Sequence, residues 1–492
     1  MLAMRGLNSF GRRGGLLLGV LLFGLQSTPG IEAAEPGATF SRSIREWTVC
    51  DGKQDDRSGV AKAFAEAKNH AFTLIVDCPV YIHVGSDISR PIFVEDGTTV
   101  QFGTHGRFVT DNVLIPTWVI ANSSDIELLN WRVEYVGQLP IDPDTKGYVI
   151  NGTFVPSRGK YQPAGAFHDF VLTPWLAANR GIVFDRSDGP ITSPWPGPTA
   201  TSAIFYVLGS SSSIKIRGMK MFVPKSADGS RFIPVCFLTT VGYKNGQRVS
   251  AALPVDADSA TMPSDIEVAD LELDGTYMGW LGNLRNSHFN NIRSFRYGDL
   301  QDSLGGSVGG LGKWFAPPHL FYITTPKFKD LRNTKLEIRN VHDWGLRSGV
   351  ARDQDKASLS GNALSLKISA ADSRVENYIS YRPDGLLDLL PSERLVMVGL
   401  MGSYDSSFLH GIYPAVRFPV GPYHDVTFED VEIEDRARGP TIGPIGDILD
   451  ANSTNVSLRK VRAVLHAPAP NAQRQPRFLG KDHSAMINIL SD

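Results

Sequence analysis

The sequence lacks the short motifs that identify many common chemistries. None of its 11 histidines stands in an HxH or HExxH spacing, so a histidine-based zinc centre is not indicated. The glycine-rich stretch 303–314 has no Gly-Lys-Ser/Thr ending and no following helical pattern, which excludes a phosphate-binding loop. We therefore predict no metal or organic cofactor, and leave open only Ca²⁺ held by aspartates, because hard cations prefer carboxylate oxygens.

The sequence also has no large excess of charge of one sign. The chain has 49 Lys and Arg against 51 Asp and Glu, a net charge of −2. Without residues 1–34, which hold three arginines and one glutamate, the net charge is −4. A chain of 492 residues this close to neutral has no electrostatic footprint for nucleic acid, so we expect no nucleic-acid partner.

Cysteine is scarce, with three residues in the chain. Cys50 and Cys78 flank a helical stretch and the strand after it, so they could pair in an oxidising compartment, although spacing alone does not decide this. Cys236 lies in the apolar run FIPVCFL and is expected to be a buried, unreactive thiol.

Long hydrophobic runs are limited to LLLGVLLFGL (16–25), which follows a basic start and precedes small residues at 33–34. This order predicts a cleaved signal peptide over residues 1–34 and a secreted or periplasmic protein. An uncleaved anchor is the alternative, but the run is short for a membrane span. We expect no membrane association after cleavage and one domain over 35–492, and the sequence does not indicate an oligomeric state.

The acidic stretch DGKQDDRSGVAKAFAEAKN (51–69) predicts a helix start and no catalytic site. Val60, Phe64 and Ala67 recur at i, i+4 and i+7, which is one face of a helix. Asp55 or Asp56 then stands where a carboxylate can accept hydrogen bonds from the first turn.

One pattern returns eight times after this helix. It consists of a polar turn, two alternating apolar residues, a polar residue that is usually Asn or Asp, and a second apolar pair. Its copies span 123–135, 211–223, 263–275, 284–295, 333–345, 372–382, 423–435 and 453–464. The polar slot is occupied by Asn130, Asp270, Asn291, Asn340, Asn377 and Asp430.

The repeat predicts a solenoid built from coils of β-strand. Alternation indicates strands, the polar residue indicates a tight bend, and repetition at a period of tens of residues is typical of stacked units. We predict an all-β, right-handed parallel β-helix with an N-terminal cap at about 45–85, coils at about 86–465 and a tail at 466–492. A β-sandwich is the alternative, and it explains the recurring bend less well.

The stretch from the DG…DD turn through the helix to FTLIVDCPVYI resembles the N-terminal segment of the pectate-lyase-like superfamily of right-handed parallel β-helices. The similarity covers residues 47–85 as a motif and 123–464 as an architecture. It implies this fold and a carbohydrate-polymer substrate. No single family is indicated, since the polygalacturonase signatures, a pectate lyase arginine motif and an epimerase-like DPHE are absent as sets.

Long excursions separate some copies of the repeat, and we expect them to form the walls of a groove on one side. They span 136–210, 300–332, 346–371 and 383–422. Residues at equivalent positions of neighbouring coils lie about 4.8 Å apart. Acids near the start of these excursions should therefore converge, and a pair of carboxyl groups suits glycoside hydrolysis. We predict Asp299, Asp302, Asp343 and Asp384 as the catalytic candidates.

Aromatic and basic residues in the same excursions predict the substrate contacts, because sugar rings stack on aromatic faces. Each single residue could equally order a loop or cover the side of the solenoid. The substrate-binding candidates are Trp314, His319, Tyr322, Arg347, Arg382, Asp388, Tyr404 and His410.

These observations favour a secreted glycoside hydrolase that cleaves a polysaccharide. A polysaccharide lyase or epimerase acting on a uronate polymer is the second hypothesis, since that chemistry needs a base and positive charge beside the uronate carboxylate. A non-catalytic glycan-binding solenoid is the third.

Overall fold

A computed structural model of the chain describes residues 40–83, 91–111, 116–137, 147–150, 153–156, 203–224, 235–240, 242–243, 260–276, 278–295, 319–323, 331–344, 364–381, 385–404, 416–418, 421–435, 446–448, 453–465 and 487–491. All of them belong to one compact unit, Phe40–Asp492. The predicted signal peptide and its cleavage point lie outside the described residues. No helix in these ranges is long and apolar enough to cross a bilayer.

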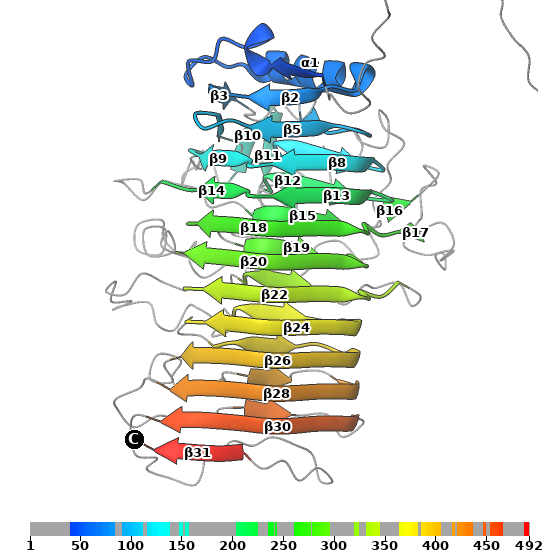
Figure 1. Ribbon diagram of the computed structural model, residues 1–492, viewed down its shortest axis with the longest axis vertical. Helices are drawn as coiled ribbons and strands as arrows, with labels where there is room; N and C mark the ends of the chain where they lie inside the picture. Colours follow the sequence, from blue (N-terminus) through cyan, green and yellow to red (C-terminus); the bar gives the residue numbers. More distant parts are fainter. Residues whose placement is uncertain are drawn as a thin grey trace, which may run out of the picture. The chain divides into compact units, whose positions relative to one another are not determined.

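Two parallel sheets dominate the unit (Figure 1). The large sheet has 17 strands: β1 (Ser41–Ser43), β2 (Thr73–Val76), β3 (Pro79–Ile82), β5 (Thr99–Phe102), β6 (Arg107–Thr110), β8 (Ser124–Leu129), β9 (Arg132–Tyr135), β13 (Ser212–Arg217), β14 (Lys220–Phe222), β18 (Ile266–Asp274), β20 (Ser287–Phe295), β22 (Leu336–Asp343), β24 (Ala371–Ser380), β26 (Ser392–Tyr404), β28 (Tyr423–Asp435), β30 (Thr454–Leu465) and β31 (Ile487–Ser491).

The small sheet has 10 strands: β4 (Ile92–Phe93), β7 (Trp118–Ala121), β12 (Phe205–Leu208), β15 (Val235–Thr240), β19 (Met278–Gly282), β21 (Phe321–Ile323), β23 (Leu366–Ile368), β25 (Leu387–Leu389), β27 (Val416–Phe418) and β29 (Gly446–Ile448). Two antiparallel pairs complete the strands, β10 (Gly147–Ile150) with β11 (Thr153–Pro156) and β16 (Gly242–Tyr243) with β17 (Ala260–Thr261).

The chain alternates between the sheets, and each passage through both makes one coil. Strand β21 pairs with β19 and β23, while β22, which follows β21 in the chain, pairs with β20 and β24. All these pairings are parallel, and parallel crossovers are right-handed in nearly every protein. The prediction of a parallel β-helix is confirmed, and the antiparallel sandwich is wrong.

The predicted excursions were drawn too long, because they contain strands of the helix itself. Residues 300–332 include β21 and residues 346–371 include β23. Residues 383–422 hold β25, β26 and β27, which amount to a complete coil and more. The repeat in β26 departs from the sequence pattern because Gly399 stands in its polar slot, where it adopts the same left-handed backbone with φ 66°.

The polar slot of the repeat is a bend in the left-handed region, as the pattern indicated. All six residues predicted there have φ between 52° and 57°. Asn and Asp adopt this conformation more readily than other residues with a side chain. Their amides also bond from coil to coil: Asn291 Nδ2 donates to Asp270 Oδ1 at 2.5 Å, and Asn377 Nδ2 donates to Asn340 Oδ1 at 3.2 Å.

A second column of left-handed bends was not anticipated. It lies five residues before the first in every coil from β8 to β30, and consists of Asp125, Ser213, Asp265, Asn286, Lys335, Asp372, Arg394, Asp425 and Asn455. Neighbouring members bond across coils here too, as Asn455 Nδ2 does to Asp425 Oδ1 at 2.5 Å. With two bends per coil, each long strand of the large sheet changes direction twice as it follows the core.

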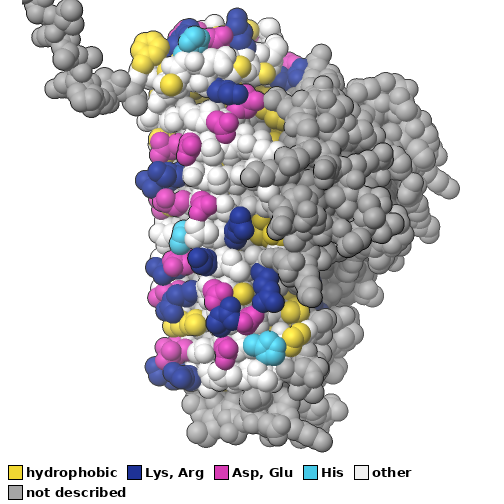
Figure 2. Space-filling view, turned by 90° about the vertical axis from the view of Figure 1, so that its right-hand side faces the viewer, with side chains coloured by type: hydrophobic (Ala, Val, Ile, Leu, Met, Phe, Trp, Pro, Cys, Tyr) yellow, Lys and Arg dark blue, Asp and Glu magenta, His cyan; other side chains and the backbone are white. Residues whose placement is uncertain are grey.

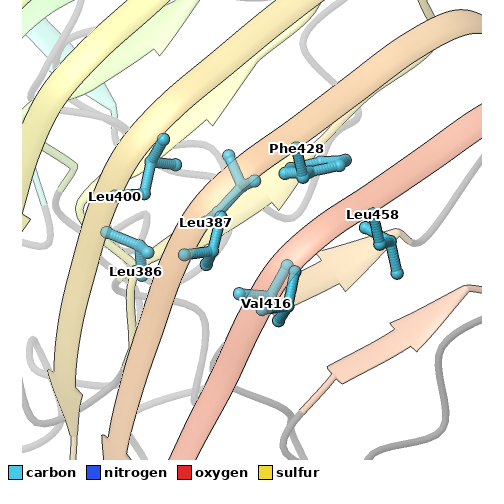
Figure 3. Close-up of a pocket in the computed structure, with 8 residues that line it drawn as sticks. Leu386, Leu387, Leu400, Val416, Phe428 and Leu458 are labelled. Carbon is cyan, nitrogen blue, oxygen red and sulfur yellow. The ribbon is translucent and has the colours of Figure 1, made fainter. Parts of the chain in front are cut away.

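The core between the sheets begins with a column of aromatic rings from the small sheet. Trp118, Phe205, Phe237 and Trp280 occupy one register position in successive coils, with ring centroids 4.7 to 5.2 Å apart. In β23, β25 and β27 the same position is aliphatic. A cavity of about 10 Å³ opens there, lined by Leu386, Leu387, Leu400, Val416, Phe428, Val431, Leu458 and Val461 (Figure 3). Its lining is wholly apolar and its volume is at the lower limit for one water, so it is no ligand site.

The N-terminal end is closed by α1 (Arg57–His70), which lies beside β2 and β4. A short 3₁₀ helix, η1 (Ile44–Glu46), precedes it. The helix starts where predicted and buries Val60, Phe64 and Ala67. Asp55 Oδ1 accepts the Arg57 N–H at 3.0 Å, so this aspartate serves the first turn.

The other aspartates of this stretch bind loop backbone. Asp56 precedes the helix, but its carboxylate accepts from the Val49 N–H at 2.7 Å and the Cys50 N–H at 3.1 Å, and not from the helix. Cys50 is joined to Cys78 by a disulfide, which settles the pairing that the spacing left open. Cys236 is buried as predicted, and burial raises the pKa of its thiol.

The outer face of the large sheet carries paired charges. Arg217 bridges to Glu267 of the next coil at 2.8 Å, and Arg462 bridges to Glu432 at 2.8 Å. Figure 2 shows basic and acidic side chains interleaved along the coils. Opposite charges on neighbouring strands attract, so they stabilise the stack and leave no field of one sign on this face.

Candidate functional site

The structure describes only some of the predicted site residues. Tyr404 ends β26, and its side chain is not described. Asp343, Asp388, His319 and Tyr322 are fully described. The remaining predictions lie outside the described residues: Asp299, Asp302, Asp384, Trp314, Arg347, Arg382 and His410.

Asp343 does not face a groove, which corrects the role predicted for it. It ends β22 with 0% of its surface exposed, and its side chain points into the core between Ser294 and Ser380 of the neighbouring coils. Ser365 Oγ donates to Asp343 Oδ2 at 2.5 Å, and the Tyr378 hydroxyl lies 2.7 Å from Ser365 Oγ. The carboxylate thus binds a serine of the core and is not exposed to a polymer at the surface.

His319 is also enclosed, with 1% of its surface exposed. Its Nδ1 lies 2.5 Å from the Leu364 carbonyl oxygen, so this nitrogen donates the bond. The ring meets Tyr322 edge to face with centroids 5.0 Å apart. His319 therefore supports Tyr322 and is not placed to touch a sugar itself.

The predicted residues Tyr322 and Asp388 occupy one column on the outer face of the small sheet. The register runs from Tyr322 in β21 to Lys367 in β23, Asp388 in β25 and Arg417 in β27. Each has apolar neighbours before and after it that point into the core, as Leu387 and Leu389 do around Asp388. The alternation of the strand thus directs all four side chains outward.

Lys367, Asp388 and Arg417 form a compact charged triad. Arg417 grips the aspartate with two nitrogens, Nη2 at 2.5 Å from Oδ2 and Nε at 3.3 Å from Oδ1. Lys367 Nζ lies 3.1 Å from the same Oδ2. Asp388 has no exposed surface, whereas the side chains of Lys367 and Arg417 remain 19% and 13% exposed.

The triad keeps its aspartate ionised. Burial raises the pKa of the Asp388 carboxyl, but the hydrogen bond from Arg417 and the charge of Lys367 outweigh burial and bring the pKa below its ordinary value. Such a group is a poor general acid at neutral pH. Asp388 is therefore a positioning residue that holds two cations, and the substrate contact predicted for it stays a prediction.

The triad lies beside an aromatic ring, and Lys367 and Arg417 are the members that solvent reaches. Lys367 Nζ lies 4.9 Å from the centre of the Tyr322 ring, which is a cation–π contact. Lys and Arg together bind carboxylates and other oxyanions, and a ring beside them can stack on a sugar. The arrangement suits an acidic sugar unit.

Lys367 and Arg417 were missed from the sequence although a signal was present. The segments FYI, LKI, LDL and VRF each place one polar residue between two apolar ones. This is the two-residue period of a strand with one buried face. Aligning these triplets would have placed Lys367, Asp388 and Arg417 in one column.

The described ranges contain no group of three or more His, Cys, Asp or Glu side chains that could hold a metal ion. The aspartate-bound Ca²⁺ considered from the sequence stays untested.

No family model and no curated protein matches the chain. Similar solved structures exist, among them PfbA, a surface adhesin of Streptococcus pneumoniae (TM-score 0.39, 11% identity, 92% of each chain). Another is an endo-xylogalacturonan hydrolase from Aspergillus tubingensis (TM-score 0.38, 9% identity, 92% of this chain and 100% of that one). A third is the A-module of the mannuronan C-5 epimerase AlgE6 from Azotobacter vinelandii (TM-score 0.36, 11% identity, 91% of this chain and 93% of that one).

Structures of this kind are right-handed β-helix proteins of the pectate-lyase-like superfamily, the group that the N-terminal segment resembles. All three TM-scores lie below 0.5. The fold assignment therefore rests on the strand register described above, and the activities named belong to those proteins.

Proposed function

We propose that the protein is a secreted enzyme that acts on a polysaccharide bearing carboxylate groups. The observation that carries this proposal is the charged triad, in which a buried aspartate fixes two cations beside Tyr322 on the outer face of the small sheet. A carboxylate of the polymer would bind to Lys367 and Arg417, and its sugar ring would contact Tyr322.

Cleavage by hydrolysis is the first reaction we propose. It needs two carboxyl groups, one protonated to assist the leaving oxygen and one ionised as base or nucleophile. Because Asp343 is buried in the core and Asp388 is held as an ion, the candidates that remain are Asp299, Asp302 and Asp384. The triad would then bind and orient the acidic sugar, since a fixed geometry lowers the entropy cost of reaction.

Elimination or epimerisation is the second candidate, and the triad specifically favours it. Both reactions begin with removal of the proton beside a uronate carboxylate, which leaves negative charge on that carboxylate. Two preorganised cations stabilise this charge more in the transition state than in the ground state. Tyr322, whose ring centre lies 4.9 Å from Lys367 Nζ, carries a hydroxyl that can take part in proton transfer.

The decisive experiment incubates the purified protein with polygalacturonate, alginate and neutral polysaccharides. Reducing ends and the ultraviolet absorbance of unsaturated uronates are read together. Hydrolysis raises reducing ends alone, elimination raises both, and epimerisation raises neither but changes the proton NMR spectrum. Binding of the polymer without any of these changes would instead mean a glycan-binding protein.

Lys367→Met tests the role of the triad in any of these reactions. We expect a higher Kd for the acidic polymer and an unchanged Kd for the same polymer after chemical reduction of its carboxylates. Lys460→Met is the matched control, because Lys460 pairs with Asp430 on the large sheet. Equal effects of Lys367→Met on both polymers would contradict carboxylate binding at the triad.

A further inference from the structure

Three aromatic side chains stack on the outside of the large sheet, whereas the triad lies on the small sheet. Phe295 ends β20, and Trp344 and Tyr381 directly follow β22 and β24. The Trp344 N–H donates to the Ser294 carbonyl and the Tyr381 N–H donates to the Asp343 carbonyl. The three residues, here called the aromatic strip, thus stand at one position in consecutive coils.

The rings of the aromatic strip are parallel but only partly overlapped. Phe295 and Trp344 have centroids 6.3 Å apart with planes 6° from parallel, and Trp344 and Tyr381 have centroids 5.4 Å apart at 16°. Both distances exceed the coil spacing of about 4.8 Å, so the rings are displaced sideways and leave part of each face uncovered. Trp344 is 46% exposed, among the most exposed large apolar residues described.

Acidic residues stand at both ends of the aromatic strip. Asp274 pairs in register with Phe295. Beyond Tyr381 come Ser403 and Glu434, whose side chains are joined by a 2.7 Å hydrogen bond from the serine hydroxyl. The row on one side contains Arg293, His342 and the apolar Ile379. The aromatic strip itself is three rings long, with one ring from each of three consecutive coils.

We propose that the aromatic strip is a second polysaccharide-binding surface, which takes uncharged sugar units of a chain lying along the coils. The C–H faces of sugar rings pack on aromatic faces, and carboxylates accept hydrogen bonds from sugar hydroxyls. The three rings carry no charge, so the strip suits neutral sugar units where the triad suits acidic ones. The inference rests on the proposed function only in taking the ligand to be a polysaccharide.

The dimensions of the aromatic strip argue against a protein as its occupant. A stable protein interface buries about 800 Å² on each partner. Three partly covered rings, one in each of three coils, provide only a small part of that area. One extended sugar chain needs no wider surface, and it would hold the polymer on the protein while other units reach the triad.

Affinity measurements with neutral polymers test this inference. The probes are insoluble cellulose, xylan and mannan in pull-down assays and cellohexaose in calorimetry. We expect Trp344→Ala to weaken binding about three- to tenfold, the range of a ring-stacking contact, and Trp344→Phe to weaken it less. Phe40→Ala, which removes a more exposed ring at the N-terminal end, is the control and should bind normally.

The outcomes separate the aromatic strip from the triad. Unchanged affinity in Trp344→Ala would overturn the strip and leave the proposed function standing. An inactive protein that still binds neutral polymer through Trp344 would refute the proposed function and keep the strip. Loss of a dimer in sedimentation of Trp344→Ala would mean that a second copy covers the rings, against the inference.

A further measurement uses the wild-type protein, so it does not depend on whether a variant folds. Neutral polymer should protect Trp344 from oxidation by N-bromosuccinimide, as read by mass spectrometry of its peptide. Oxidation of Trp344 at the same rate with and without polymer would count against the strip.

Discussion

Replacing Asp388 with asparagine should lower the free energy of unfolding strongly, although the two side chains have nearly the same shape. The substitution removes the anion that Lys367 and Arg417 share, while both cations keep most of their surface buried. Breaking a buried ion pair costs about 3–5 kcal/mol. Because the cations retain 19% and 13% exposure and can be hydrated in part, we expect about 2–4 kcal/mol here.

Urea unfolding at neutral pH, followed by circular dichroism, measures this loss. The control is Asp372→Asn, which removes an aspartate that Arg394 also binds with two nitrogens, but on the exposed face of the large sheet. Surface pairs of this kind contribute little, so the control should unfold near the wild-type midpoint. Equal midpoints for the two variants would refute the burial of the triad.

Three other outcomes follow from the same contacts. The pKa of Asp388 is lowered in the folded state, so its contribution to stability is full above the ordinary aspartate pKa of about 3.9 and is lost as the pH falls further. The variant Asp388→Asn should therefore lose less stability than the wild type when the pH is lowered. Asn340 has φ 53°, so Asn340→Gly should be more stable to unfolding than Asn340→Ala by about 1 kcal/mol, since both variants lose the amide bonds but only alanine is strained. Equal unfolding midpoints of the two variants would argue against the left-handed bend. Asp343→Asn should leave kcat of any cleavage unchanged while lowering the melting temperature, and an inactive variant of normal stability would restore Asp343 to the active site.

The fold was predictable because its bends have a local cause. A left-handed residue must be one that tolerates positive φ, so Asn and Asp recur in the polar slot and reveal the coil period. The second column of bends escaped because it tolerates more residue types, including Lys335 and Arg394. The disulfide could not be derived in the same way, since it depends on how α1 brings Cys50 toward Cys78.

The candidate site shows where reasoning from residue chemistry and reasoning from strand period diverge. Asp343 was chosen as catalytic because it is an acid near a long excursion. Yet it lies two residues after Val341, which is buried, and side chains two apart in a strand share a face. The period alone therefore predicted that Asp343 points inward. The same rule places Asp388, between two buried leucines, on the outside. In a solenoid the direction of each side chain is fixed by its distance from the bend, so a carboxylate can act on a polymer only if its position in the coil is an outward one.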